Sequence, residues 1–284
     1  MTRSHAVTTY TPEAEIRRPG LLLRNMMRDL GNSRELAWRL AQRDIKAQYR
    51  QSYLGYLWAF IIPLATTVTW VYLNVAGVVR VEDTTIPYPV YVFTGTMLWQ
   101  VLVEAVQSPL QQVGMARGMI TKLNFPREAV VLSGLIKVSS NVGIKLLLLV
   151  PAVLLLGVKP DMHVLLLPIG LAALVVFGMA VGLLLAPIGM LYSDIAKGIP
   201  LVAQFVMYLT PVVFAVPSNG WLAAICNWNP ATPLIMTARS WLTGSSSPMI
   251  GYFIVVFCAS LLLLFVSWLI YRITIPVLIE RMGS

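Results

Sequence analysis

The sequence predicts an all-α integral membrane protein, because it is strongly apolar, poor in charge and divided into long apolar runs. Of its 284 residues, 57% are hydrophobic and 12% are charged, and the mean hydropathy is +0.75. Water-soluble domains carry about 25% charged residues, so this chain has too little polar surface to cover a globule in water. We expect a cytoplasmic region at 1–53 followed by one six-helix transmembrane domain at 54–284.

The N-terminal region contains one element that predicts contact with a membrane surface. Between residues 33 and 50, Leu36, Leu40 and Ala41 share one face of a helix, with Ser33 as the expected N-cap. The basic residues that recur at helical spacing are Arg39, Arg43, Lys46 and Arg50. This pattern is typical of an amphipathic helix that lies on the anionic inner leaflet.

Six apolar runs are long enough to cross about 30 Å of hydrocarbon at about 1.5 Å per residue. The predicted spans are 54–79, 88–113, 129–157, 163–191, 197–216 and 249–273. The fourth and fifth are separated only by Tyr192-Ser193-Asp194 and Lys197. The external stretch 217–248 has Trp221, Trp228 and Trp241 together with Pro230, Pro233 and Gly244, which indicates short re-entrant helices at the outer interface.

The distribution of basic residues predicts that both termini are cytoplasmic. Sixteen of the 21 lysines and arginines fall on the side of the N-terminus, and the opposite side holds Arg80, Lys159 and Arg239. Membrane topology therefore accounts for the excess of basic residues that gives the net charge of +9. We expect a lipid membrane as a partner and no nucleic acid.

Polar residues inside the second and third spans form stripes. Gln100, Glu104, Gln107 and Gln111 share one helical face, as do Lys137, Asn141 and Lys145. If the two spans run in opposite directions, Glu104 and Lys137 both lie about 15 Å deep, and we expect an ion pair between them. Two interpretations stay open: the pair neutralises charge within the bundle, or it contacts a substrate.

A second stripe begins with aromatic residues and becomes polar along the first span. Its members are Tyr49, Tyr53, Tyr56, Phe60, Thr67 and Asn74. Gln204, Tyr208 and Pro211 repeat the spacing in the fifth span. The tyrosines fit either an interfacial aromatic belt or a stacking surface for sugar rings. Gly178 and Gly182 form one GxxxG pattern, which serves packing within one subunit or between two.

The residue inventory argues against catalysis by this chain. The only histidines are His5 and His163, the two cysteines are 32 residues apart, and no phosphate-binding GxxxxGK[ST] loop occurs. We expect no catalytic residue, no metal site and no cofactor in this chain.

Several short stretches resemble one family. They are Arg43 to Lys46 with Tyr49-Arg50, Ser52 to Trp58 with Pro63, Leu123 to Glu128, Ser193 to Ile195 with Pro211-Val212, and Asn229-Pro230 with Pro233. Together they resemble the ABC type-2 permeases that export polysaccharides such as O-antigen, capsule and teichoic acid. The resemblance covers about residues 30 to 280 and departs at Ser193, where the family's pattern has an arginine.

The resemblance implies a half-transporter of the bacterial inner membrane. Two copies would form the translocation path, and two copies of a separate ATPase would bind ATP and Mg. The substrate would be a polyprenyl-pyrophosphate-linked glycan, with Arg50 either at its pyrophosphate or snorkelling at a helix end. Carried over from the family, the helix that couples to the ATPase falls on Gly118, Lys122, Leu123, Asn124 and Phe125.

Other classes of membrane protein remain as alternatives. A drug or small-lipid exporter would have a drier path without the tyrosines. An ion-coupled carrier would need a buried carboxylate relay, for which only Glu104 qualifies. An integral-membrane glycosyl- or acyltransferase would need clustered acids or histidines in its loops.

Overall fold

The computed structural model describes residues 19–50, 53–78, 84, 86–120, 126–159, 161–245, 247 and 249–283, and its regular structure in these ranges is helical throughout. The α-helices are α2 (Pro19–Asn32), α3 (Arg34–Arg50), α4 (Trp58–Val75), α5 (Tyr88–Ile120), α6 (Glu128–Leu155), α7 (Leu167–Leu191), α8 (Ser193–Met207), α9 (Trp221–Trp228), α10 (Ala231–Thr243) and α11 (Ile250–Gly283). The 3-10 helices η1 (Gly55–Leu57) and η2 (Met162–Leu166) precede α4 and α7. The predicted all-α class is confirmed.

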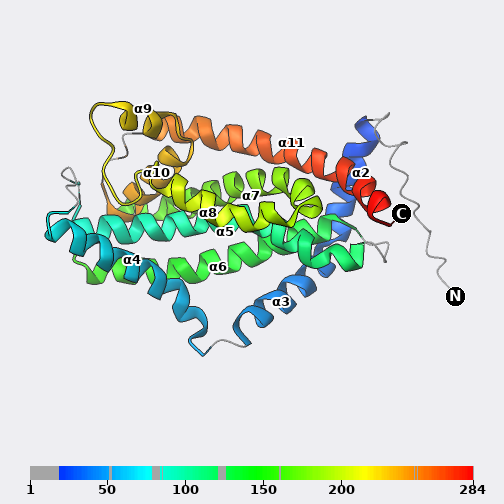
Figure 1. The fold of residues 1–284 in the computed structure, drawn as a ribbon, viewed down its shortest axis with the longest axis horizontal. Helices are drawn as coiled ribbons and strands as arrows, with labels where there is room; N and C mark the ends of the chain where they lie inside the picture. The colour runs from blue at the N-terminus through cyan, green and yellow to red at the C-terminus, as the bar shows by residue number, and fades with distance from the viewer. Residues whose placement is uncertain are drawn as a thin grey trace.

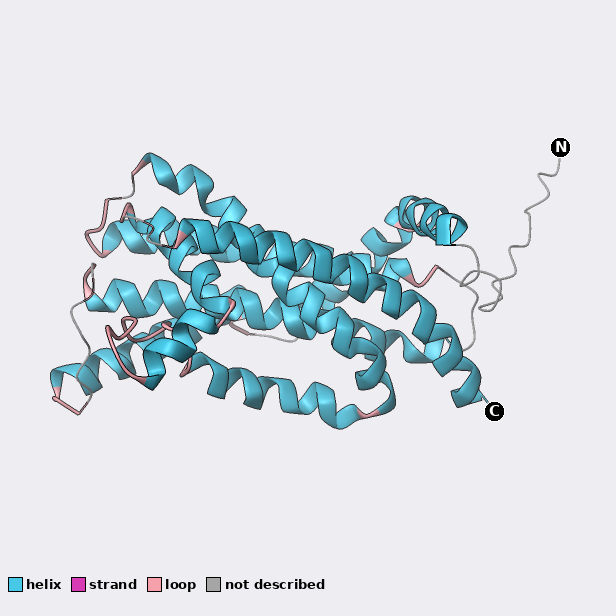
Figure 2. Cartoon of the chain, turned by 90° about the horizontal axis from the view of Figure 1, so that it is seen from above, coloured by secondary structure: helices cyan, strands magenta, loops and turns pink. Residues whose placement is uncertain are grey.

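Five helices of the described chain are long and apolar enough to cross a membrane: α4, α5, α6, η2 with α7, and α11. Figure 1 shows α5, α6, α7 and α11 running lengthwise, and α7 contacts each of the other three. Figure 2 shows the same bundle of long helices from above. The short helices predicted in the external stretch are α9 and α10, which lie at one end of the bundle (Figure 1).

The predicted fifth span, 197–216, is shorter as a helix than expected. Helix α8 has 15 residues, about 22 Å at 1.5 Å per residue, and the chain continues in turns through residue 214. Pro211 explains this end, because it has no N–H to donate to the carbonyl of Met207 and so cannot extend the helix.

The contact between α5 and α7 forms the centre of the bundle, and α5 is the most buried of the five spans. Gly178 and Gly182 let the two backbones approach closely: a Cβ on Gly182 would lie 2.1 Å from the carbonyl oxygen of Val106, and one on Gly178 would lie 2.5 Å from Cβ of Ala105. The GxxxG pattern therefore serves packing within one subunit.

Helix α3 has the predicted two faces. Ala37 and Ala41 are fully buried, and α3 packs against α6. The four basic residues of its other face are exposed. Ser33 does not cap α3: its hydroxyl donates back to the carbonyl of Asp29 over 2.5 Å, which joins the end of α2 to the start of α3. Helices α3 and α4 then diverge as the two arms of a V (Figure 1).

The close contact of α5 and α7 predicts that Gly182→Ala destabilises the protein. The added methyl group must displace backbone, and overpacking of this kind costs about 1–3 kcal/mol. We expect a lower midpoint of thermal unfolding in detergent. Gly143→Ala is the matched control, because a Cβ there meets nothing within 4 Å. Equal midpoints for the two variants would contradict the packing described here.

Candidate functional site

The two predicted polar stripes face each other across a pocket. The pocket lies between α3, α5 and α6 and has a volume of about 330 Å³. Its walls are Gln48, Glu104, Gln107, Ser108, Gln111, Lys137, Val138 and Asn141. Seven of these eight side chains are polar, which is rare between membrane-spanning helices and points to a ligand or to water.

The acidic residue of this pocket has a different partner from the one predicted. Glu104 accepts a hydrogen bond from the ammonium group of Lys145 over 2.5 Å, whereas Lys137 lines the same pocket without forming this pair. Lys145 is buried, with 3% of its surface exposed. The ion pair expected between Glu104 and Lys137 is therefore wrong.

The positions of the helix ends explain why Lys145, and not Lys137, pairs with Glu104. The prediction ended the second span at residue 113, but α5 continues to Ile120. Glu104 is thus 16 residues from the end of α5, and Lys145 is 17 residues from the start of α6 at Glu128. In an antiparallel pair these two positions are level, and Lys137 is about 12 Å nearer the end of the bundle where α6 begins.

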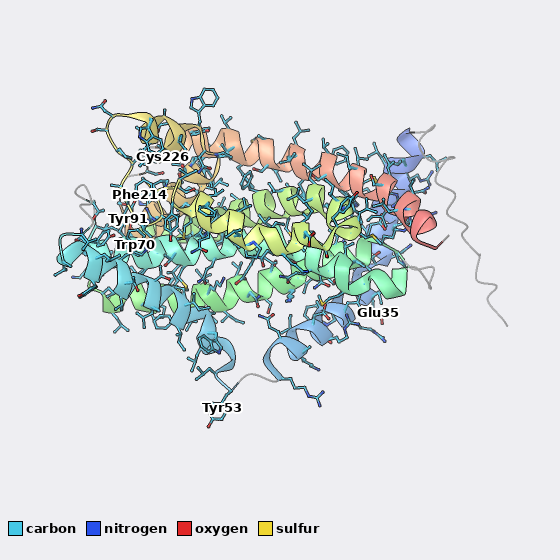
Figure 3. All side chains as sticks on the ribbon, in the orientation of Figure 1. Glu35, Tyr53, Trp70, Tyr91, Phe214 and Cys226 are labelled. Atoms are coloured by element: carbon cyan, nitrogen blue, oxygen red, sulfur yellow. The ribbon has the colours of Figure 1, made fainter. Side chains whose placement is uncertain are left out.

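The structure divides the aromatic stripe of the first span. Tyr53 and Arg50 are exposed, and Figure 3 shows Tyr53 extending from the apex of the V. Phe60 instead packs edge-on against Phe93 of α5 at a centroid distance of 5.4 Å. Thr67 is buried, with 6% of its surface exposed, and its hydroxyl donates to the carbonyl of Pro63.

The remaining members of the stripe and its counterpart on α8 are placed as follows. Tyr49 and Tyr56 lie in α3 and η1, where the structure describes the backbone and not their side chains. Asn74 is near the end of α4 and is half-buried. Gln204 and Tyr208 are exposed on α8 and at its end. Tyr208 lies 6.2 Å from Trp70 of α4 between ring centroids, so α4 and α8 meet there.

A clamp that sequence analysis missed holds the outer end of α8. The hydroxyl of Tyr91 on α5 lies within hydrogen-bond distance of the carbonyls of Pro211, at 3.2 Å, and Phe214, at 2.9 Å. From α9, the Asn229 amide donates to the Thr210 hydroxyl over 2.8 Å. Figure 3 shows Tyr91 and Phe214 together at this end of the bundle. The non-helical stretch after α8 thus has partners for its carbonyls.

Arg239 of α10 completes the clamp. Its guanidinium lies 3.7 Å from the centre of the Tyr91 ring and donates to the carbonyls of Pro211 at 3.1 Å and Val212 at 2.9 Å. Gly95 leaves room for it, because a Cβ there would lie 2.2 Å from Nη2. Burial lowers the pKa of this guanidinium, and carbonyls with an aromatic face take the place of a carboxylate. The sequence offered one signal, an arginine on the side with few basic residues.

Three buried charges join the elements at the opposite end of the bundle. Arg272 of α11 donates to Asp29 of α2 over 2.8 Å and to Glu128 at the start of α6. All three side chains are less than 8% exposed. Glu128 lies three residues after the predicted coupling segment, so this cluster joins the start of α6 to α2 and α11.

The coupling residues themselves are mostly outside the described chain. Gly118 lies in the last turn of α5, whereas Lys122, Leu123, Asn124 and Phe125 lie outside the described residues. No group of three or more metal-binding side chains occurs in the part of the chain that the structure describes.

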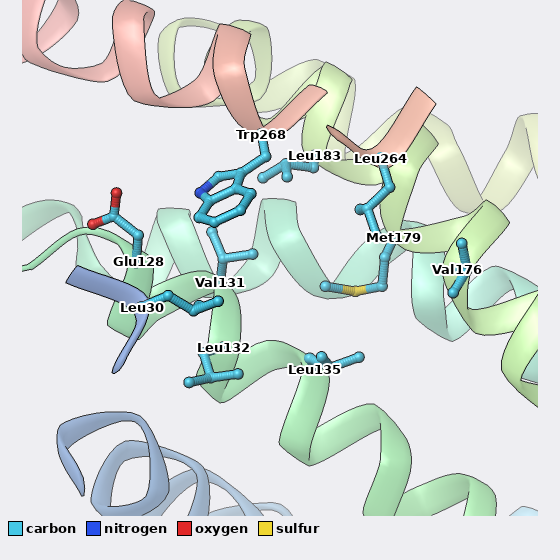
Figure 4. A pocket seen from close by; sticks show the side chains of 10 residues that line it. All are labelled: Leu30, Glu128, Val131, Leu132, Leu135, Val176, Met179, Leu183, Leu264 and Trp268. Atoms are coloured by element: carbon cyan, nitrogen blue, oxygen red, sulfur yellow. The ribbon is translucent and has the colours of Figure 1, made fainter. Parts of the chain in front are cut away.

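A second cavity, of about 240 Å³, lies beside Glu128 and is almost entirely apolar (Figure 4). Leu30, Val131, Leu183 and Trp268 are among its lining residues. This lining suits hydrocarbon and offers a sugar almost no hydrogen bonds.

Comparison with known proteins is consistent with this architecture. The family described as "ABC-2 type transporter" matches residues 35–243. An O-antigen export system permease protein RfbA from Myxococcus xanthus is 28% identical over 190 residues, which cover 66% of this chain and 72% of that protein. Two proteins of the same description from Klebsiella pneumoniae are 26% and 24% identical over 220 residues, covering 75% of this chain and 82% of theirs.

The observed ion pair predicts an energetic coupling between Glu104 and Lys145. In a double-mutant cycle with Glu104→Gln and Lys145→Met, we expect a coupling free energy of about 0.5–3 kcal/mol. It is measured from unfolding of the detergent-solubilised protein. The matched cycle of Glu104→Gln with Lys137→Met should give a coupling near zero, because Lys137 is not the partner. A larger coupling in the second cycle would contradict the pairing.

Proposed function

Because the chain belongs to the ABC-2 type transporter family, we propose that it is the permease of an ATP-driven exporter that moves a lipid-linked polysaccharide across the bacterial inner membrane. The chain is a multi-pass membrane permease and contributes transport without catalysis. ATP and Mg would bind to a separate ATPase, present in two copies.

One observation carries the choice of cargo: the similarity to three O-antigen export permeases, which extends over 66–75% of this chain. The proposed substrate is a glycan carried on polyprenyl pyrophosphate. The lipid would stay in the bilayer while the sugars pass through the protein. Tyr53, exposed at the apex between α3 and α4, is well placed to meet such a substrate at the cytoplasmic side.

The exposed faces of α4 and α8 support a path made by two copies. Only two of the 18 residues of α4, Pro63 and Thr67, are buried in the single chain. Gln204 and Tyr208 of the α8 region are exposed. We propose that a second copy covers part of these faces and that the polar positions face the glycan. Arg50, exposed at the end of α3, remains the proposed partner of the pyrophosphate.

The ATPase is proposed to contact Gly118 to Phe125, between α5 and α6. The Asp29–Glu128–Arg272 cluster supports this assignment, because it ties the start of α6, three residues after the segment, to two other helices and would transmit a movement of α6 to them. Glu104 is less suited to an ion-coupled carrier, because Lys145 neutralises it.

The first experiment tests the transporter class. We expect that the tagged protein, purified from native membranes in mild detergent, retains a stoichiometric subunit with a phosphate-binding loop and hydrolyses ATP in a vanadate-sensitive manner. Mass spectrometry identifies the subunit. Transport by this chain alone, with no ATPase bound, would overturn the proposal and favour an ion-coupled carrier.

The second experiment tests the cargo and the tyrosines. Combining Tyr53→Ala with Tyr56→Ala should reduce glycan at the cell surface about tenfold, since two lost aromatic contacts weaken binding by about 1–3 kcal/mol. Glycan is quantified after extraction of whole cells.

Tyr72→Ala is the matched control, because Tyr72 is an exposed tyrosine on another face of α4. Normal export by the double variant would leave the tyrosines as interfacial anchors. If deletion of the gene leaves surface glycan unchanged but makes the cells sensitive to drugs, the cargo is a small molecule instead.

A further inference from the structure

The pocket between α3, α5 and α6 has charges and donors that the export path does not use. Its acidic residue, Glu104, is neutralised by Lys145. Lys137 also lines the pocket, is half-buried, and has no carboxylate within 4 Å among the described residues. The pocket therefore carries one net positive charge between membrane helices, which is costly unless an anion binds there.

The uncharged groups of the pocket supply further hydrogen-bond donors. The hydroxyl of Ser108 is buried and has no partner within the described part of the chain. The amide of Gln107 accepts a hydrogen bond from Gln111 over 3.1 Å and keeps its two N–H donors. The ammonium of Lys137 on α6, with the hydroxyl and the amide of Ser108 and Gln107 on α5, matches the oxygens of a phosphate group.

The position of the pocket indicates which phosphate reaches it. Gln48 belongs to α3, whose exposed basic face is expected to lie along the inner leaflet. Lys137 is nine residues into α6, about 14 Å from its first residue, and a lysine side chain can extend several ångströms toward the interface. With α3 along the inner leaflet, the α3 wall is the side of the pocket nearest to the lipid headgroups.

We propose that this pocket binds the phosphate of an inner-leaflet lipid, with the Lys137 ammonium as its counter-charge and Gln107 and Ser108 as donors. Two lipids offer this chemistry: an anionic phospholipid and the polyprenyl pyrophosphate carrier. Because Gln48 forms the α3 wall of the pocket, the bound ligand also lies against α3.

The test uses the full-length protein in nanodiscs of phosphatidylcholine that contain phosphatidylglycerol, without glycan or nucleotide. Bound phosphatidylglycerol is measured by native mass spectrometry. Lys137→Met should weaken its retention about tenfold, as expected for one charge-assisted hydrogen bond, and Lys137→Arg should restore it. Gln107→Leu, which leaves all charges in place, should also weaken retention.

Lys197→Met is the matched control, because it removes an exposed lysine of α8 outside the pocket. Retention by Lys137→Met equal to that of the unmodified protein, or equal loss in Lys197→Met, would overturn the proposal. Binding of phosphatidylcholine as tight as that of phosphatidylglycerol would do the same. Each variant is compared only after its thermal midpoint shows that it is folded.

A competition arm identifies the source of the phosphate. If polyprenyl pyrophosphate displaces phosphatidylglycerol from the unmodified protein and not from Lys137→Met, the natural ligand is the carrier lipid. If it displaces none, the ligand is the phospholipid, and the site is a lipid-binding site apart from the export path. The assay contains no ATP and measures no export, so failure of the proposed transport function leaves its result unaffected.

Discussion

Hydrocarbon offers no hydrogen bonds, so an interruption of a helix or a charge that is cut off from water must be met by a partner. The break after α8 shows how this is done. The carbonyl of Leu209 is met by Asn229, which directly follows α9, and those of Pro211, Val212 and Phe214 are met by Tyr91 of α5 and Arg239 of α10. The polar side chains at this end of the bundle thus supply the hydrogen bonds that the interrupted helix lacks.

Charges follow the same rule at the opposite end of the bundle. Arg272 is bound by two carboxylates from helices that are distant in the sequence. Such buried clusters contribute little net stability compared with apolar packing, but they leave few alternative arrangements. The cluster therefore fixes how α2, α6 and α11 meet beside the segment proposed to contact the ATPase, while the glycines of α7 fix the centre.

Sequence reasoning predicted the helices, the two faces of α3 and the polar stripes, because these depend on periodicity within one segment. It did not identify the partner of Glu104, because pairing across a hairpin depends on where each helix ends. An error of seven residues at the end of α5 shifted the register by two helical turns. Arg239 was missed for a related reason: its partners are backbone carbonyls, which every residue has and no residue type reveals.

The junction between α7 and α8 is a single extended residue, Tyr192, with φ −119° and ψ 106°. The segment that follows α8 is held by side chains of α5 and α10 and by Cys226 of α9, whereas nine of the 15 residues of α8 itself are exposed in the single chain. The two ends of α8 are thus held differently, by several side chains at one end and by one backbone residue at the other. A change in the backbone angles of Tyr192 alone would alter the angle between α7 and α8.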